Sequence, residues 1–247
     1  ICALKIDFLL LTLRNFFYKG NYIYAVNYHD TPEIENSTLE QQLIFYKKHF
    51  SDVSNSDLDQ FFENRKWHKD KPGLILSFDD GLRSNYDIAA PLLEKYGFTG
   101  WFFIPTDFPG VQVNEQITFM NNHSISPRVN YNDGRMAMTW NEIQQLDKKH
   151  VIGCHTKTHH RMIASTPKNK LQSEIIESKR ILEEKLGHTV DMFCWVGGEE
   201  FSYSSQGAQT IREATYKYSF MTNCMPITIH TNPLQLQRNN IETSWSI

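Results

Sequence analysis

Short apolar runs alternate with amphipathic segments along most of this chain. Runs of this length, rich in aliphatic and aromatic residues, are typical of parallel strands that helices bury on both faces. The pattern predicts strands at Tyr22–Tyr28, Leu74–Phe78, Gly100–Ile104, Val151–Cys154, Met192–Trp195 and Tyr218–Thr222.

Two of the intervening helices are predicted from their first residues. Thr38 with Gln41, and Thr139 with Glu142, have the spacing of a capping box, in which the two side chains satisfy free backbone N–H groups at the start of a helix. The first of these helices is expected to run to about Lys48.

Two further helices are predicted from the spacing of their apolar residues. One has Leu171, Ile175, Leu182 and Leu186 on a single face, with Gly187 as its expected stop. The other has Ile88, Leu92 and Tyr96 on one face, and Pro91 should kink or delay it.

The alternation of strands and helices predicts an α/β fold, and a single α/β barrel fits the length. The chain has 247 residues, 40% of them hydrophobic, and no repeat or linker divides it. Residues 1–247 are therefore expected to form one barrel domain. Because the first residue is Ile1 and not Met, the chain is expected to be a fragment at one or both ends, and a lost signal peptide stays open.

Composition argues against several classes of partner. A net charge of −3 gives no basic field, so nucleic acid or an anionic membrane is not expected as the main partner. The apolar stretch Phe8–Leu13 is far shorter than the roughly 20 residues of a membrane span. The four cysteines are widely spaced without C-x-x-C and are expected to be buried thiols. A cytoplasmic and a cell-envelope location both stay open.

Two carboxylates stand at the end of the second predicted strand, in "LILSFDDG". In a parallel barrel, polar residues at the carboxyl end of a strand face the edge where active sites are assembled. Asp79 and Asp80 are therefore candidate site residues. The alternative is a turn in which one aspartate caps the next helix and the other is solvated.

A histidine pair follows the fourth predicted strand, where "VIGC" runs into "HTKTHH". His155 and His159 are four residues apart, so on a helical turn both imidazoles could hold one metal ion. One carboxylate with two histidines would leave coordination positions open for water, as in a catalytic site. Zinc is the first expectation, and Co²⁺, Mn²⁺ or Ni²⁺ would accept the same ligands.

"SFDDG" together with "HTKTH" resembles the first two motifs of the polysaccharide deacetylases, the NodB-homology group of carbohydrate esterases. "NYHDTP" is similar to the opening segment of longer members, and "LQSEIIESKRILEEKLG" to the helix after the histidines. The resemblance extends from Tyr28 to about Tyr218. It implies a distorted, TIM-like (β/α) barrel with about seven parallel strands.

The resemblance implies a role for each motif residue. Asp80, His155 and His159 would bind the metal, and Asp79 would be the catalytic base. A metal-bound water, its pKa lowered towards about 7, would attack an N-acetyl carbonyl while Asp79 removes the remaining proton. The products would be acetate and an amino sugar of a cell-surface polysaccharide or glycan precursor.

The chain departs from the family pattern around "FCWVGGEE". Many members carry there an arginine that orients the catalytic aspartate, and this segment has none. Trp195 is a candidate substrate-binding platform for a sugar ring, with a core position as the alternative. Glu199 and Glu200 are expected to be solvated loop charges.

The family's histidine that protonates the leaving amine has no secure counterpart. His230, in "ITIHTNP", resembles it locally, although it follows the Trp195 region closely and could be a surface residue. His29, at the end of the first predicted strand, is a second candidate, with a structural role as the alternative. An acid beyond Ile247 also stays open.

Three functions remain in competition. The first is a metal-dependent N-deacetylase acting on carbohydrate. The second is a related amidase or O-acetyl esterase with another substrate, and the third is a non-catalytic glycan-binding relic. The intact set of two aspartates and two histidines argues against the relic. A phosphoesterase or nuclease would need more carboxylates and a second metal ion.

Overall fold

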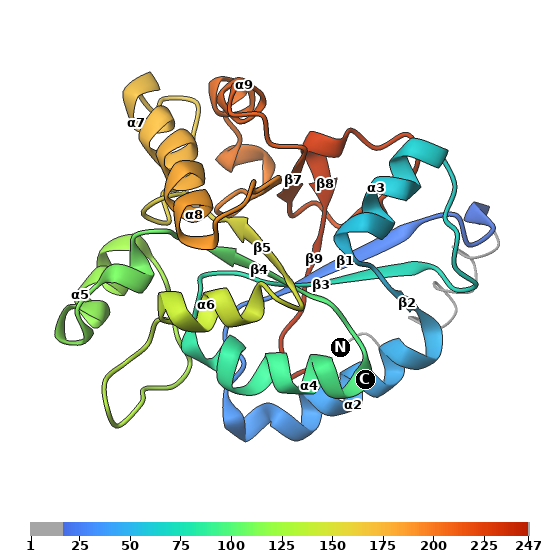
Figure 1. The fold of residues 1–247 in the computed structure, drawn as a ribbon, viewed down its shortest axis with the longest axis horizontal. Helices are drawn as coiled ribbons and strands as arrows, with labels where there is room; N and C mark the ends of the chain where they lie inside the picture. Colours follow the sequence, from blue (N-terminus) through green and yellow to red (C-terminus); the bar gives the residue numbers. More distant parts are fainter. Residues whose placement is uncertain (1–16, 247) are drawn as a thin grey trace.

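A curved sheet of parallel strands forms the centre of the computed structural model, which describes residues 17–246 (Figure 1). The strand order is β8-β7-β6-β5-β4-β3-β1-β9, and the short strand β2 also pairs with β3. The strands are β1 (Ile23–Tyr28), β2 (Ser51–Asp52), β3 (Gly73–Phe78), β4 (Gly100–Ile104), β5 (Val151–Cys154), β6 (Met192–Cys194), β7 (Tyr218–Met221), β8 (Leu236–Gln237) and β9 (Asn239–Asn240).

The two ends of the sheet are joined by one short segment. β8 and β9 are separated only by Arg238; β8 pairs with β7, and β9 pairs with β1. In Figure 1 the last strand, in red, accordingly passes beside the first, in blue. The expected (β/α) barrel is therefore confirmed as a nearly closed one. Strands of two residues show no hydrophobic period, so β2, β8 and β9 were not predicted.

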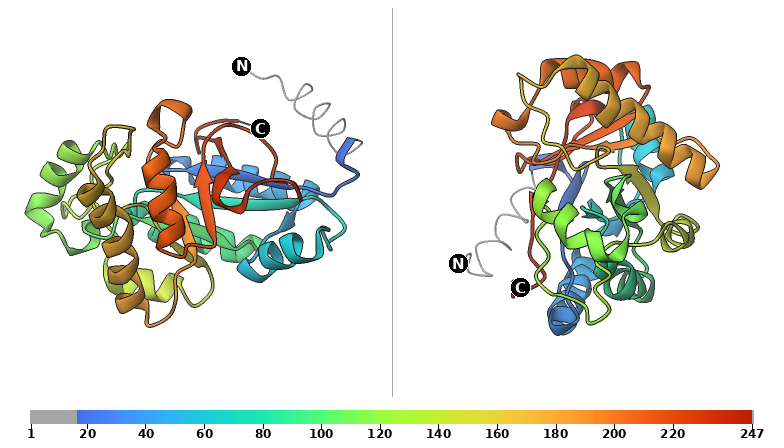
Figure 2. Two further views of the ribbon diagram at one scale, coloured as in Figure 1. Left: turned by 90° about the horizontal axis from the view of Figure 1, so that it is seen from above. Right: turned by 90° about the vertical axis from the view of Figure 1, so that its left-hand side faces the viewer.

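The helices lie around the outside of the sheet, as Figures 1 and 2 show, and α2 packs beside α4. They are α2 (Asn36–His49), α3 (Asn55–Asn64), α4 (Ala90–Tyr96), α5 (Val113–His123), α6 (Trp140–Leu146), α7 (Lys168–Gln172), α8 (Ser178–Leu186) and α9 (Ser205–Glu213).

One of the two predicted capping boxes is present. The Thr139 hydroxyl accepts from the N–H of Glu142, and the Glu142 carboxylate accepts from the N–H of Thr139. The box at Thr38 is wrong, because α2 begins at Asn36 and Thr38 lies inside its first turn. The 3₁₀ turn Glu33–Glu35 leads directly into that helix, so no side-chain cap is needed there.

The helix predicted from the leucine spacing is confirmed, and Gly187 ends it with φ of +80°. The sequence did not predict the π-helical turn Ser173–Glu177 between α7 and α8. A second π-helical turn, Asn85–Ala89, precedes α4. Pro91 is the second residue of α4, which directly follows this π-helical turn, so the helix is distorted next to the residue that cannot donate a backbone hydrogen bond, in agreement with the predicted kink.

Alternating residues of the strands build two separate cores. Trp101 and Phe103 of β4 belong to one cluster with Phe220 of β7, while Phe102 packs in the other cluster with α4 and α6. Only glycine fits at position 153 in β5, because a Cβ added there would lie 2.7 Å from the Phe103 ring.

The remaining sequence expectations concern cysteines and the membrane. Cys154 and Cys194 are buried free thiols as predicted, whereas Cys224 is exposed and Cys2 lies outside the described residues. Within residues 17–246 no helix has the length and apolar character to cross a membrane. The stretch Phe8–Leu13 also lies outside the described residues.

A buried carboxylate in the first turn of helix α3 takes part in a capping box with Ser54. Asp57 accepts from the backbone N–H and the hydroxyl of Ser54 and pairs with Lys69 at 2.7 Å. Burial raises the pKa of Asp57, but Lys69 and Ser54 together lower it by more, so the pKa of Asp57 lies below the usual value. Asp57 therefore stabilises the fold above its unfolded-state pKa, and this contribution is lost as the pH falls through the folded-state pKa.

We predict that Asp57→Asn lowers the free energy of unfolding by about 1 kcal/mol at pH 7, because a capping interaction of this kind is lost. The difference from the wild type should shrink as the pH falls below about 4. Urea unfolding at several pH values measures both, with exposed Asp70→Asn as the control. A difference that does not change with pH would contradict this assignment.

Candidate metal and catalytic site

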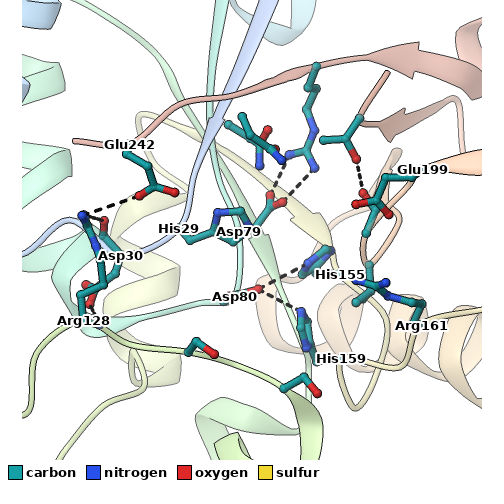
Figure 3. Close-up of a pocket in the computed structure, with 18 residues that line it drawn as sticks. His29, Asp30, Asp79, Asp80, Arg128, His155, His159, Arg161, Glu199 and Glu242 are labelled. Atoms are coloured by element: carbon teal, nitrogen blue, oxygen red, sulfur yellow. Dashed lines mark hydrogen bonds and ion pairs between the residues drawn. The ribbon is translucent and has the colours of Figure 1, made fainter. Parts of the chain in front are cut away.

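The two motifs singled out in the sequence meet at one pocket of about 330 Å³ (Figure 3). Asp79 and Asp80 follow β3, and His155 and His159 follow β5. Both strands point their carboxyl ends to the same edge of the barrel, because all strand pairs along the sheet are parallel. The alternative of a simple capping turn at Asp79 and Asp80 therefore does not hold.

Three side chains of the pocket converge on one point. Oδ1 of Asp80 lies 3.1 Å from Nε2 of His159 and 3.5 Å from Nε2 of His155. The three potential ligand atoms all lie within 4.8 Å of one another. This is the spacing of groups that bind one cation in common.

The hydrogen bonds behind the two imidazoles determine which nitrogen faces the pocket. Nδ1 of His155 lies 3.0 Å from the Cys194 carbonyl oxygen, and Nδ1 of His159 lies 2.6 Å from the His123 carbonyl oxygen. A carbonyl only accepts, so both Nδ1 atoms donate, and each neutral ring turns its Nε2 lone pair towards Asp80.

These lone pairs meet a carboxylate that has no donor of its own. Oδ1 of Asp80 is buried and without a hydrogen-bond partner. Three electron-rich atoms pointing at each other are unfavourable unless a cation lies between them or a ring takes up a proton. The residues therefore fit a divalent metal ion.

Electrostatics at this point keep Asp80 ionised. Burial raises the pKa of Asp80, but the neighbouring His159 and His155 lower it by more, so the pKa lies well below the usual range. Burial lowers the pKa of His159, while the Asp80 charge raises it to above its usual value. Each group therefore favours the charged form of the other in the absence of a metal ion.

The backbone of both motifs adopts conformations that are rare for residues other than glycine. Asp80, Thr156 and His159 have φ of +73°, +64° and +57°. Each such residue costs on the order of 1–3 kcal/mol and persists only where the surroundings hold it. The left-handed turns bend the chain sharply after each strand and aim the ligands into the pocket.

Asp79 faces a buried arginine. Nη1 and Nη2 of Arg238 donate to its two oxygens at 2.7 and 2.8 Å, and both side chains are almost fully buried. Burial raises the pKa of Asp79, but the Arg238 charge and the nearby histidines lower it below the usual value. Asp79 is therefore an ionised carboxylate held in one orientation.

Arg238 makes the contact with the aspartate for which the segment "FCWVGGEE" has no arginine. The family pattern has this arginine around residues 193–200, whereas here it comes from the junction of β8 and β9. No motif surrounds it in "LQLQRNN". Only the three-dimensional closure of the barrel brings it within reach of Asp79.

Cys194 completes the surroundings of the pair. Nη2 of Arg238 lies 2.9 Å from its Sγ, and burial raises the pKa of the Cys194 thiol well above its usual value. Asp79, His155 and Cys194 also have ligand atoms within 4.8 Å of one another. However, the guanidinium in contact with Asp79 and Cys194 repels a cation, so the first group is the better metal site.

His29 lies in the same pocket, at the end of β1. Figure 3 places its imidazole beside Asp79. The Asn85 side chain donates to the His29 carbonyl oxygen at 2.8 Å and so holds the backbone of this residue.

The other candidates lie elsewhere. His230 is exposed in the segment between β7 and β8 and is not among the pocket-lining residues. Trp195 is 1% exposed, donates from Nε1 to the Ser219 hydroxyl and stacks on Tyr203. The sugar platform expected at Trp195 is therefore not available, and the alternative of a core residue is correct.

Besides Arg238, the pocket is lined by five charged residues that were not predicted as site residues: Asp30, Arg128, Arg161, Glu199 and Glu242. Glu199 had been expected to be a solvated charge, as Glu200 is. Arg128 belongs to the long excursion 107–138, where its N–H donates to Asp30 and its side chain to Thr243. The excursion thus forms one wall of the pocket.

Comparisons with known proteins agree with this geometry. A family profile described as polysaccharide deacetylase matches residues 66–219. No curated protein sequence matches. Among solved structures, the Streptococcus pyogenes deacetylase PplD in complex with acetate has 18% identity and a TM-score of 0.72 over 91% of this chain and 94% of that one.

Two further solved structures are similar. A de-N-acetylase from Aggregatibacter actinomycetemcomitans has 15% identity and a TM-score of 0.72, covering 92% of this chain and 97% of its own. IcaB from Ammonifex degensii has 16% identity and a TM-score of 0.69, covering 90% and 92%. At these identities the likeness concerns the fold.

We predict that Arg238→Met destabilises the protein by about 3–5 kcal/mol, because it leaves the Asp79 carboxylate buried without its partner. Adding Asp79→Asn should recover part of this loss, so the two changes are not additive. Urea unfolding of both single variants and the double variant measures the coupling, with exposed Arg180→Met as the control. Additive losses would show that the pair is not coupled.

Proposed function

Because this chain belongs to the polysaccharide deacetylase family, whose profile matches residues 66–219, we propose that it removes N-acetyl groups from a carbohydrate by metal-assisted hydrolysis. Membership makes it a hydrolase of the deacetylase type. The metal, the residue roles and the N-acetylated glycan substrate are the content of the proposal.

One observation supports it above the others. Three ligand atoms converge in the pocket: Nε2 of His155, Nε2 of His159 and a carboxylate oxygen of Asp80. Beside them lies a second carboxylate, Asp79, which is paired separately with Arg238. A site that only bound sugar would have no need for three facing ligand atoms.

In this proposal Asp80, His155 and His159 hold a divalent metal ion. Two imidazoles and one carboxylate suit zinc, and Co²⁺, Mn²⁺ or Ni²⁺ accept the same donors. When bound, the ion supplies a Lewis acid that polarises the amide carbonyl and lowers the pKa of water towards about 7.

Asp79 takes up the proton of the attacking water. Its pKa lies below the usual value, so it is ionised at neutral pH. The bidentate contact with Arg238 restricts rotation of the Asp79 carboxylate. The oxygen that accepts the proton from water therefore keeps one position. The same contact explains how a chain without arginine in residues 193–200 orients its base.

His29 gives a proton to the departing amine. It lies in the pocket near Asp79 and Asp80, whereas His230 is exposed outside it. The backbone of His29 is fixed by Asn85, and its side chain is half-buried, so it can exchange protons with solvent between turnovers.

The substrate proposed is a glycan that carries N-acetyl groups. The pocket of about 330 Å³ suits a single sugar unit with its acetamido group. The similar Streptococcus pyogenes deacetylase was solved with acetate, the product that this reaction would release.

We predict that the metal-loaded protein releases acetate from N-acetylglucosamine oligomers and that Asp79→Asn lowers kcat by ~10²–10⁴-fold. Enzymatic assay of acetate, with metal content measured on each sample, tests this. Removal of the metal with a chelator should abolish the release, and adding Zn²⁺ should restore it. Bound metal without acetate release from sugars, but with release from an O-acetyl ester, would point to an esterase instead.

We also predict that His29→Gln lowers kcat by ~10²–10⁴-fold with unchanged metal content, because the leaving amine loses its proton donor. His230→Gln should leave kcat unchanged. Steady-state kinetics on both variants assign the acid, and the opposite result would move this role to His230.

A further inference from the structure

A buried glutamate outside the pocket holds the loop that carries both histidines. Glu174 lies in the π-helical turn Ser173–Glu177, and its side chain has no exposed surface. Its Oε2 accepts from the backbone N–H groups of Lys157 and Thr158 at 2.9 and 2.8 Å. Its Oε1 accepts from the Thr158 hydroxyl at 2.6 Å.

These contacts fall between the two histidines. Lys157 and Thr158 are the middle residues of the segment from His155 to His159. The residues on either side of them, Thr156 and His159, both have left-handed backbone angles. A short segment with two such residues keeps its shape only where other groups hold it.

The carboxylate is well suited to this task. A charged acceptor forms shorter and stronger bonds with backbone N–H groups than a neutral one. Lys170 pairs with Glu174 at 2.7 Å and balances its charge, and Lys170 itself is 40% exposed. Both carboxylate oxygens of Glu174 bind the loop directly.

The helix is distorted where Glu174 leaves it. A π-helical turn shifts the following side chains relative to a regular α-helix, and such turns often occur at functional sites. Further along the same turn, Glu177 is 50% exposed and pairs with the Lys157 side chain and not with the backbone of the loop. The chain thus offers two glutamates near the loop, of which one reaches its backbone.

We propose that Glu174 is a positioning residue of the metal centre, which sets the spacing of His155 and His159 and thereby the affinity for the metal ion. The inference rests on the metal site proposed above. Groups that orient metal ligands from behind typically change metal affinity by ~10–100-fold when they are replaced. A residue that only stabilised the fold would leave that affinity unchanged in the folded protein.

The test compares Glu174→Gln with Glu177→Gln. Glutamine has nearly the shape of glutamate, but it has one acceptor oxygen and no charge. Zn²⁺ binding to the metal-free proteins is measured by competition with a chromophoric chelator, well below the midpoint of thermal unfolding. Circular dichroism of the same samples shows whether each protein is folded.

We expect Glu174→Gln to weaken Zn²⁺ binding by ~10–100-fold and Glu177→Gln to leave it unchanged. Unchanged affinity in folded Glu174→Gln, or equal losses in both variants, would overturn the inference while leaving the metal site in place. A wild-type protein that binds no divalent metal ion would overturn the proposed function as well.

A second variant decides the matter if Glu174→Gln does not fold. Thr158→Val removes one of the three loop contacts and keeps the carboxylate, its charge and its bonds to the backbone. We expect a smaller loss of Zn²⁺ affinity in the same direction. An affinity equal to that of the wild type would overturn the role of Glu174.

Discussion

The buried ion pair between Asp79 and Arg238 joins the chemistry of this protein to its architecture. Arg238 is the single residue between β8 and β9, the two short strands that complete the barrel between β7 and β1. Its side chain is almost fully buried, and the guanidinium donates to Ser77 and Cys194 and lies over the Phe103 ring. Two charges removed from water are tolerated only when their geometry is good. The position of the last strands is therefore coupled to the orientation of the proposed base.

Around this pair, each proposed site residue is held by a different part of the chain. The carbonyl groups of Cys194 and His123 orient the two imidazoles, and Asn85 holds the backbone of His29. The His123 carbonyl lies at the end of α5, in the excursion between β4 and β5. The side chains of the pocket are thus held by segments that are distant in sequence and meet at one edge of the barrel.

Much of this arrangement could be predicted from local patterns. Six strands were predicted within about two residues, because buried parallel strands are short, apolar and separated by helices. The positions of Asp80, His155 and His159 followed from the rule that the carboxyl ends of parallel strands share one edge. Motif spacing carried this information, since each motif is continuous in the sequence.

The features that were missed depend on long-range contacts. Arg238 and Asp79 are 159 residues apart, and neither the spacing nor the composition of "LQLQRNN" indicates a partner for the arginine. Trp195 was a candidate sugar platform, with a core position as the alternative, and its ring lies in the core, where it stacks on Tyr203 and donates to the Ser219 hydroxyl. The direction of a side chain at a strand end is decided by packing, which a single sequence does not display.

The position of Arg238 in the last strands of the barrel affects when the site can form during protein synthesis. A ribosome makes the chain from its amino end, so the carboxylate of Asp79 and both histidines emerge well before the arginine that pairs with this carboxylate. Until residues 236–240 close the sheet, no partly synthesised chain contains the finished constellation. In the proposed mechanism, the base is therefore oriented only in chains that extend past β9 and have closed the sheet.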